Sequence, residues 1–382
     1  MYTLQIPRNV YAGDGSLAAL AGILAENDVK NLVLFTDKGI RGAGLLDVVV
    51  QALPEVYRHA PVLDDLPAEP TYEQAQKLVD QCKALKADFI VAVGGGSVMD
   101  TAKLSSILMT DELTIRDLLD DPKQGRKFCK IVSIPTTAGT GAEATPNAIV
   151  AVPEKQLKVG IVNPAMISDY VILDPIMIRN LPRKLSASTG IDAMAHAIEC
   201  FTSNKATPMS DAFAIRAFEM IMKNIVPACD DRDALEAKSQ MLLASFFAGV
   251  AITASGTTAV HALSYPLGGK YHIAHGVSNA ILLTPVMRFN EPVIADRLAV
   301  AYDRCFNSGF DKTNAEKADA VITKMEEIVR HLDIPTSLRE FNVPAEDLET
   351  LVSAGMEVTR LLNNNMRKVT ADDARAIYKQ VL

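Results

Sequence analysis

Residues 87–103 read ADFIVAVGGGSVMDTAK, and this stretch decides the fold class that the sequence predicts. It opens with a run of apolar residues that ends in three glycines, a pattern typical of a buried strand over residues 87–96. From Ser97 to about Leu108 the apolar residues follow helical spacing. A buried strand, a glycine turn and a helix in succession indicate a parallel sheet that is covered by helices.

The same alternation continues on both sides of that stretch. NLVLFTD (31–37) and FCKIVSIPTT (128–137) are predicted to be further buried strands. Helical periodicity is present over residues 16–29 and again over residues 73–86. Because strands alternate with helices, we predict an α/β N-terminal domain with a parallel sheet, spanning residues 1–183.

After LPRKL (181–185) helix-forming stretches dominate the sequence. Two of them are PMSDAFAIRAFEMIMKNIV (208–226) and AKSQMLLASFFAGVAITASG (237–256). We therefore predict an all-α C-terminal domain over residues 184–382. A chain of 382 residues is also long enough for two domains.

Composition narrows the classes of protein and of partner. Hydrophobic residues make up 49% and charged residues 22%, which is typical of a soluble globular protein. The net charge is −8 and no basic stretch is present, which argues against nucleic acid and membrane surfaces as partners. The five cysteines are dispersed without CxxC spacing, as in reduced proteins, and the start of the chain lacks a signal-peptide pattern. We predict a cytoplasmic location.

Four side chains have a spacing that could surround one metal ion: Asp192, His196, His261 and His275. Asp192 and His196 are four residues apart in TGIDAMAHAIECF, so a helix would place both on one face. His261 lies in an apolar stretch of helical character, and His275 precedes Gly276 in an expected loop. They include three of only six histidines in the chain. The sequence therefore predicts a metal site.

The donor types also bear on the metal. One carboxylate and three imidazoles suit Fe(II), Zn(II), Co(II) or Ni(II), and the absence of cysteine argues against a structural zinc site. We expect Fe(II), with Zn(II) as the alternative, because catalytic zinc commonly has three protein ligands. The competing interpretation is that the aspartate caps a helix and the histidines satisfy hydrogen bonds in the core.

Two polar, glycine-containing loops indicate a nucleotide site. In AVGGGSVMDTAK (92–103) the glycines at 94–96 would let backbone amides approach a pyrophosphate at a helix N-terminus, although they could equally form only a tight turn. In PTTAGTGAEAT (135–145) the hydroxyls of Thr136, Thr137 and Thr140 could bind phosphate or ribose. Asp37, at the end of a strand, would bind ribose hydroxyls and favour NAD over NADP; its alternative role is a helix N-cap.

Taken together, these motifs resemble the iron-containing (type III) alcohol dehydrogenases, the family that includes lactaldehyde reductase and propanediol dehydrogenase. GGGSVMDTAK, PTTAGTGAE, TGIDAMAHAIE, HALSYPLGG and HGVSNAIL follow the family's order and spacing. The resemblance implies a dinucleotide-binding α/β domain and a helical metal-binding domain, an architecture like that of dehydroquinate synthase. It also implies at least a homodimer.

The resemblance assigns roles residue by residue. It implies that the four predicted ligands bind the metal. It places the pyrophosphate of NAD on Gly95, Gly96 and Ser97. It implies further contacts between the nucleotide and Asp37, Thr136, Thr137, Thr140 and Lys158.

Three departures from the family pattern affect the substrate and the proton route. Many members have another histidine four residues after the third metal ligand, where this chain has Tyr265. His272 could replace it as a proton relay or could equally be a surface residue, and we expect Tyr265 to be a pocket wall rather than an acid. LSYP resembles the hydroxyacid-oxidising branch of the family. Glu69 stands where many members have asparagine.

The function we predict is hydride transfer between NAD(H) and a short-chain primary alcohol or its aldehyde, assisted by the metal. The alternative is a hydroxyacid dehydrogenase or transhydrogenase that acts on a compound like 4-hydroxybutyrate. A lyase of the dehydroquinate-synthase type is less favoured, because its phosphorylated substrate needs clustered basic groups. A silent NAD-binding protein would predict a damaged metal site.

Overall fold

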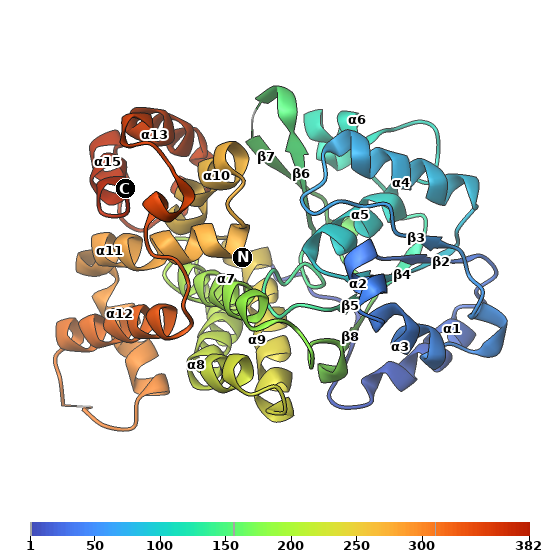
Figure 1. Cartoon of the computed structure of the whole chain (residues 1–382), viewed down its shortest axis with the longest axis horizontal. Helices are drawn as coiled ribbons and strands as arrows, with labels where there is room; N and C mark the ends of the chain where they lie inside the picture. Colours follow the sequence, from blue (N-terminus) through green and yellow to red (C-terminus); the bar gives the residue numbers. More distant parts are fainter. Residues whose placement is uncertain (1, 156, 310) are drawn as a thin grey trace. The chain divides into compact units, whose positions relative to one another are not determined.

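The computed structural model describes residues 2–155, 157–309 and 311–382 (Figure 1). The chain forms two compact units, one of which is Gln5–Leu181 and the other Pro182–Leu382 together with the residues before Gln5. The sequence predicts a boundary after residue 183, and the division between the two units lies two residues earlier, after Leu181. Pro182 is the N-cap of the first long helix of the second unit, where a fixed φ and a missing N–H are tolerated.

The first unit is built on a six-stranded sheet in which every neighbouring pair is parallel. In spatial order the strands are β1 (Asn9–Ala12), β8 (Tyr170–Leu173), β5 (Lys130–Pro135), β4 (Phe89–Gly94), β2 (Leu32–Phe35) and β3 (Val62–Leu63). From β2 the chain first adds β3 on one side and then β4 on the other. The strand order therefore reverses between β2 and β4, and such a reversal is where open α/β sheets bind ligands.

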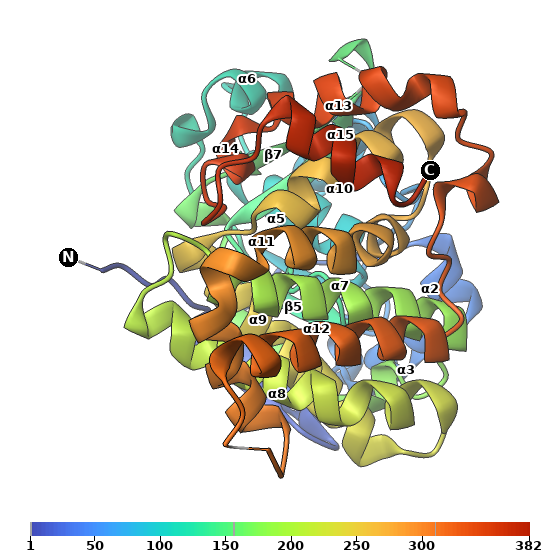
Figure 2. The same cartoon turned by 90° about the vertical axis from the view of Figure 1, so that its left-hand side faces the viewer.

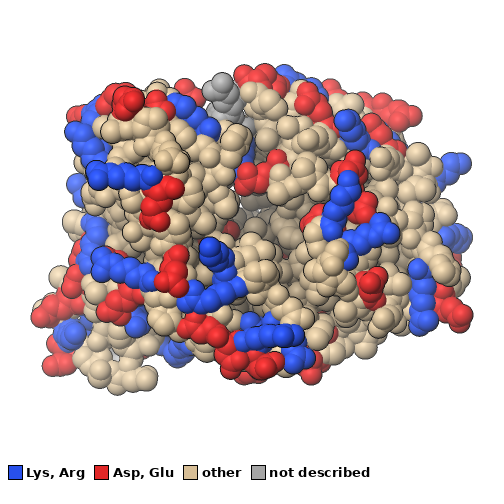
Figure 3. Space-filling model, in the orientation of Figure 1, with Lys and Arg blue, Asp and Glu red and all other residues tan. Residues whose placement is uncertain are grey.

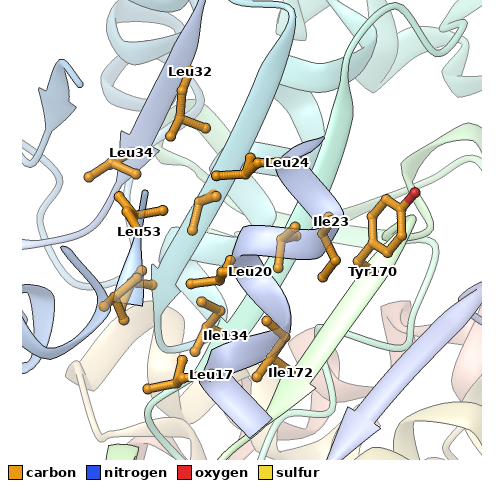
Figure 4. Close-up of a cluster of buried hydrophobic side chains, with 14 of the residues drawn as sticks. Leu17, Leu20, Ile23, Leu24, Leu32, Leu34, Leu53, Ile134, Tyr170 and Ile172 are labelled. Atoms are coloured by element: carbon orange, nitrogen blue, oxygen red, sulfur yellow. The ribbon is translucent and has the colours of Figure 1, made fainter. Parts of the chain in front are cut away.

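Helices cover both faces of this sheet. The longer ones are α1 (Ala19–Glu26), α3 (Leu45–Ala52), α4 (Tyr72–Ala84) and α5 (Gly96–Ile107). Residues of α1 and α3 share a buried cluster with Phe89, Val91 and Val93 of β4, while residues of α4 and α5 pack with Ile90 and Ala92. Alternate residues of one strand thus face opposite layers. Figure 4 shows the first cluster, in which Leu20, Ile23 and Leu24 of α1 lie over the sheet.

Smaller elements complete the α/β unit. They are the helices α2 (Lys38–Gly42) and α6 (Ile115–Asp120) and the antiparallel hairpin of β6 (Asn147–Val152) and β7 (Leu157–Val162). Ala148 and Val150 of β6 are buried in a cluster with Leu104 of α5 and Ile115 of α6. The predicted class of this unit, α/β with a parallel sheet, is confirmed.

The described residues of the second unit form helices and the segments that connect them, apart from an isolated bridge between Ser203 and Asn365. Its helices are α7 (Arg183–Phe201), α8 (Pro208–Asp230), α9 (Leu235–Ser255), α10 (Ala259–Tyr271), α11 (His275–Cys305), α12 (Asn314–His331), α13 (Leu348–Glu357), α14 (Thr359–Leu362) and α15 (Ala371–Lys379). Helix α7 packs against α8, α9 and α11, as Figure 2 shows from the side of this unit. Its residues from Gly190 to Phe201 are all buried, so α7 is the central helix of the unit.

One described helix, α9, is long and apolar enough to cross a membrane by length and composition. However, 61% of its most apolar window is buried inside the protein, where α9 packs against α7 and α8. This is the environment of a core helix.

Candidate active site

The helical unit brings the four predicted metal ligands together. Asp192 and His196 lie one turn apart on α7, His261 lies in the first turn of α10, and His275 is the first residue of α11. One ligand atom from each residue can be chosen so that all four lie within 4.8 Å of one another. Three of the four residues are buried, and His275 is partly exposed.

The distances within this quartet fit a bound cation. From Oδ1 of Asp192, the Nε2 atoms of His196, His261 and His275 lie at 3.9, 3.6 and 3.6 Å. Four tetrahedral ligands about 2.1 Å from a metal ion would be separated by about 3.4 Å. The donor set of one carboxylate and three imidazoles suits Fe(II) or Zn(II). The residues present therefore fit a divalent metal.

The charges of the site also favour a cation. Burial raises the pKa of Asp192, but the imidazoles of His196, His275 and His261 outweigh burial and hold this pKa below its usual value. Burial lowers the pKa of His261, and the carboxylates of Glu199 and Asp192 reverse this and raise it to about 9. Two buried carboxylates thus stabilise positive charge among the ligands.

Glu199 is a site residue that the sequence analysis missed. It lies on α7 and is fully buried, and its Oε2 contacts Nδ1 of His261. Its Oε1 accepts hydrogen bonds from the backbone N–H of Thr258 at 3.0 Å, the hydroxyl of Thr258 at 2.7 Å and the N–H of Val260 at 2.8 Å. A signal was present, because residues 192, 196 and 199 share one face of a helix.

Asn279 is a second residue that the sequence analysis missed. One turn after His275 on α11, its Nδ2 donates to Oδ1 of Asp192 at 2.7 Å. The same nitrogen lies 3.1 Å from Nε2 of His261 and 3.3 Å from Nε2 of His275. Its Oδ1 is buried without a hydrogen-bond partner among the described residues. The amide therefore lies against three of the four ligand side chains.

Close helix packing fixes the position of His275. A Cβ atom on Gly276 would lie 2.2 Å from the backbone oxygen of Ser188 on α7, so only glycine allows α11 to approach α7 this closely. The sequence pattern predicts a loop at His275, and this prediction is wrong, because His275 is the first helical residue after the N-cap Ala274. The glycine that suggested a loop instead serves this close contact.

The segment before α10 is held by the C-terminal part of the unit. Asn364 donates from Nδ2 to the backbone oxygen of Thr257 at 2.9 Å. Asn365 and Asn290 exchange two side-chain hydrogen bonds of 2.8 and 2.9 Å. The Asn364 contact restrains the segment that leads into α10, which carries His261, and the Asn365 contacts join the same C-terminal segment to α11.

The two predicted proton-handling residues have different surroundings. Tyr265 is half-buried one turn after His261, and its ring centre lies 6.1 Å from that of His275. Burial raises the pKa of Tyr265, so its phenol is neutral at physiological pH. His272 is the exposed C-cap of α10, with φ of 54°, and within the described chain no hydrogen bond or ring contact joins it to the quartet. Of the two, only Tyr265 therefore has a ring contact with one of the ligand side chains among the described residues.

The two glycine-containing loops of the α/β unit lie against each other. Gly95 is the N-cap of α5 and directly follows β4. A Cβ atom on Gly96 would lie 3.1 Å from Cγ2 of Thr140, and one on Gly95 would lie 3.8 Å from Oγ1 of Thr137. The hydroxyl of Thr136 is buried without a partner among the described groups. Backbone amides and an available hydroxyl thus gather at the carboxyl ends of β4 and β5.

Asp37 follows β2 at the point where the strand order reverses. It is the N-cap of α2, and its Oδ1 accepts a hydrogen bond of 2.9 Å from the N–H of Ile40. This capping role is the alternative to ribose binding that the sequence predicts for Asp37. Asp37 therefore follows the strand that pairs with β4, and Gly95 directly follows β4.

Lys158 and Glu69 form a pair that the sequence did not indicate. Nζ of Lys158, on β7, lies 2.6 Å from Oε1 of Glu69. The backbone N–H of Glu69, whose φ is 54°, donates to Oγ of Ser97 at 3.2 Å. Lys158 and Ser97, which the family resemblance assigns to the nucleotide, therefore both contact Glu69, one of the residues that depart from the family pattern.

Buried charged side chains hold the second glycine-containing loop, residues 135–145, in place. Lys103 is fully buried, pairs with Asp100 at 2.8 Å, and donates to the backbone oxygens of Ala142 at 2.9 Å and Asn147. Glu143, in the same loop, is also buried, and burial raises its pKa to about 7. The loop is therefore fixed by a lysine inside the protein rather than by solvent-exposed contacts.

On the face shown in Figure 3, Lys and Arg side chains alternate with Asp and Glu. No extended basic patch is visible on that face.

Comparisons with known proteins agree with this geometry. The family model described as "Iron-containing alcohol dehydrogenase" matches residues 7–175, and "Fe-containing alcohol dehydrogenase family, C-terminal" matches residues 186–382. The chain is 31% identical to long-chain-alcohol dehydrogenase 1 of Geobacillus thermodenitrificans over 98% of this chain and 95% of that protein. It is 29% identical to the NAD-dependent methanol dehydrogenase of Bacillus methanolicus over the full length of both. A crystal structure of 1,3-propanediol oxidoreductase is similar with a TM-score of 0.91, 27% identity and full coverage of both chains.

Proposed function

The chain belongs to the iron-containing alcohol dehydrogenase family, and from this premise we propose that it transfers a hydride between NAD(H) and a short-chain primary alcohol or its aldehyde. It is an iron-containing, NAD-using enzyme of this family. The observation that carries the proposal is the buried quartet of Asp192, His196, His261 and His275, whose donor atoms lie within 4.8 Å of one another.

Each part of the chain has a separate task in this reaction. We assign the four ligands to holding the metal, which when bound supplies a Lewis acid that polarises the substrate oxygen, while bound NAD accepts the hydride. The carboxylate of Asp192 would offset part of the positive charge of the metal ion, and the three imidazoles would complete its set of protein ligands. Half-buried Tyr265 lies beside His275 and limits the space next to the ligands.

The nucleotide is assigned to the carboxyl edge of the parallel sheet. The N–H groups of Gly95, Gly96 and Ser97 begin α5 and can bind the pyrophosphate at the positive end of its dipole. The hydroxyls of Thr136, Thr137 and Thr140 supply further hydrogen bonds. The carboxylate of Asp37 is assigned to the adenosine ribose, and the ammonium group of Lys158 is assigned to another polar group of the nucleotide. Asp37 also favours NAD over NADP, because its carboxylate would repel a 2′-phosphate.

A second candidate is an alcohol or aldehyde that carries an anionic group, as in a hydroxyacid. Arg360 is the second residue of α14, which packs against α10, the helix of His261 and Tyr265. The guanidinium is exposed, has no ion pair with a described residue, and lowers the pKa of Tyr265 in opposition to burial. An available guanidinium beside the site could bind a carboxylate.

The substrate experiment follows the absorbance of NADH at 340 nm without oxygen. Protein stripped of metal is reloaded with Fe(II) or Zn(II) and given propanal, butanal or succinic semialdehyde. Metal-dependent turnover of the simple aldehydes supports the first candidate. Turnover of the semialdehyde alone, abolished by Arg360→Ala, supports the second. No turnover of any carbonyl by the metal-loaded protein would contradict both.

The same assay separates the two predicted proton-handling residues. If Tyr265 borders the substrate, Tyr265→Ala should raise KM or change the preferred aldehyde length. If His272 relays a proton, His272→Ala should lower kcat across the pH range while KM stays near that of the wild type. We expect the first result and not the second, because His272 is exposed at the end of α10.

We also propose a cytoplasmic homodimer or higher homo-oligomer. The five cysteines are all free in the structure, as expected in a reducing compartment. β1 lies at the edge of the sheet, and Ile6 and Val10 nearby are exposed. Exposed sheet edges are common sites of association. Light scattering on the purified protein would give one chain mass if this proposal is wrong.

A further inference from the structure

We propose that Glu199 and Asn279 are positioning residues of the metal site, Glu199 by fixing the imidazole of His261 and Asn279 by holding the carboxylate of Asp192. This inference rests on the metal site of the proposed function. It adds two buried polar groups outside the quartet and predicts that metal retention depends on them.

The contacts of Glu199 determine which nitrogen of His261 faces the other ligands. Nδ1 of His261 faces Oε2 of Glu199, while Nε2 faces Asp192. A carboxylate accepts only, so the imidazole places its proton on Nδ1 and presents the lone pair of Nε2 to a cation. Such an outer carboxylate also makes the imidazole a stronger ligand.

Glu199 fixes the helix as well as the ring. Its Oε1 accepts from two N–H groups at the start of α10, at Thr258 and Val260. The first N–H groups of a helix have no partner within the helix, and a negative charge there is stabilised by the helix dipole. One carboxylate therefore sets the orientation of both α10 and His261. Together with Asp192, it supplies two negative charges for a divalent ion.

Asn279 acts on the opposite side of the quartet. Its Nδ2 donates to Oδ1 of Asp192 at 2.7 Å. This hydrogen bond joins α11 to α7 and restrains the carboxylate of Asp192. Because the nitrogen also lies 3.1 Å from Nε2 of His261, its position depends on the same groups that would bind the ion. The partnerless Oδ1 shows that the amide is oriented by the ligands and not by other neighbours among the described residues.

The main test is Glu199→Gln. A glutamine can still accept from Thr258 and Val260 through its oxygen, but its amide nitrogen would donate to Nδ1 of His261 and move the ring proton to Nε2. The protonated Nε2 cannot bind a metal. We expect the dissociation constant for Zn(II), measured by competition with a chromogenic chelator, to rise roughly 10- to 100-fold. Asn279→Ala should raise it by a smaller factor.

Three further measurements separate positioning from general damage. Glu199→Asp keeps an acceptor and should recover part of the affinity. The visible absorption of the Co(II)-loaded protein should change in Glu199→Gln and Asn279→Ala, because the ligand geometry changes. The matched control is Glu219→Gln, a glutamate of α8 that pairs with Arg216 and Lys223, and it should keep wild-type affinity and spectrum.

The outcomes distinguish this inference from the proposed function. If the wild type binds Zn(II) or Co(II) tightly and Glu199→Gln and Asn279→Ala both match it in affinity and spectrum, the positioning role is wrong and the proposed function stands. If the wild type binds neither ion, the metal site itself is wrong. If Glu199→Gln does not fold, the other two variants still test the inference. Wild-type affinity and spectrum in Asn279→Ala would refute the role of Asn279. Wild-type affinity and spectrum in Glu199→Asp would show that metal binding does not need the exact position of the Glu199 carboxylate.

Discussion

The proposed metal site and the proposed nucleotide site differ in how their polar groups are satisfied within the chain. In the helical unit, the carboxylate of Glu199 contacts four donor atoms of Thr258, Val260 and His261. In the α/β unit, the hydroxyl of Thr136 has no partner among the described groups, and Lys158 has one carboxylate that a ligand could replace. The carboxylate of Glu199 is thus held by protein groups before any ligand binds, whereas the α/β region keeps donors available for a ligand.

The difference follows from the size of the ligand that each region would hold. A single ion has no internal flexibility, so its ligands must be held in place by other protein groups. A dinucleotide supplies many acceptors of its own, and backbone N–H groups at a helix start can bind them without further side-chain contacts. Changes in the first region should therefore affect metal content, and changes in the second should affect the KM for the nucleotide.

The largest effect should come from removing a metal ligand. His261→Ala should lower kcat/KM by roughly 10³-fold or more, because Lewis-acid assistance contributes several kcal/mol and about 1.4 kcal/mol is tenfold in rate. Metal content by mass spectrometry should fall in parallel. The control is His59→Ala, since His59 is exposed in the α/β unit. Full activity and full metal content in His261→Ala would remove this residue from the site.

Two glycine substitutions compare the regions directly. Gly276→Ala would place a Cβ 2.2 Å from a backbone oxygen of α7, and we expect a loss of stability of about 3 kcal/mol together with loss of metal. Gly96→Ala would meet the flexible side chain of Thr140 at 3.1 Å, and it should mainly raise the KM for NAD. Thermal unfolding and NAD titrations measure both. If both substitutions lowered stability equally, Gly276 and Gly96 would not differ in role, and the contrast between a packing glycine and a ligand-binding glycine would be wrong.

Glu143 gives the nucleotide region a pH-dependent stability. Its pKa is about 7 in the folded protein against a usual value of 4.5, so the folded state binds more protons between these pH values. Stability should therefore decrease as the pH rises from about 4.5 to 7 and stay at the lower level above pH 7. Glu143→Gln should remove this decrease and raise stability at pH 8 by as much as about 3 kcal/mol. Denaturant unfolding at pH 5 and pH 8 tests this, and an unchanged pH dependence in the variant would exclude Glu143 as its cause.

The smallest effect concerns the choice of nucleotide. Asp37→Asn keeps the N-cap hydrogen bond to Ile40, because asparagine caps helices as well as aspartate does. It removes the charge that would repel a 2′-phosphate, so the ratio of kcat/KM for NADH to that for NADPH should fall about tenfold, equivalent to about 1.4 kcal/mol. Stability should change by a few tenths of a kcal/mol. An unchanged ratio would leave Asp37 with a capping role only.

Sequence patterns predicted the central elements of the fold better than its edges. The buried runs 31–37, 87–96 and 128–137 contain β2, β4 and β5, because a strand buried on both faces is a continuous apolar run. The two residues of β3 are too short for such a signal, and β8 was not predicted. The β6–β7 hairpin was not predicted either, although the residues of β6 alternate between buried and partly buried.

The functional residues show a similar division. The quartet could be predicted because histidine is rare in this chain and because the spacing of residues 192 and 196 fits a helix. Asn279 could not be predicted, since its role depends on the approach of α11 to α7. The pair of Lys158 and Glu69 is likewise a contact between segments far apart in the sequence. Local patterns identify ligand types, while tertiary packing determines which polar groups support them.

Buried Lys103 gives the loop between β5 and β6 a built-in reporter. Its ammonium group is fully enclosed and binds the backbone of Ala142 and Asn147, whereas Lys38 is largely exposed. Amine-reactive labels should therefore modify Lys38 quickly and Lys103 only when the loop opens. The ratio of the two labelling rates would measure how often this segment leaves its folded position, and whether NAD makes such excursions rarer.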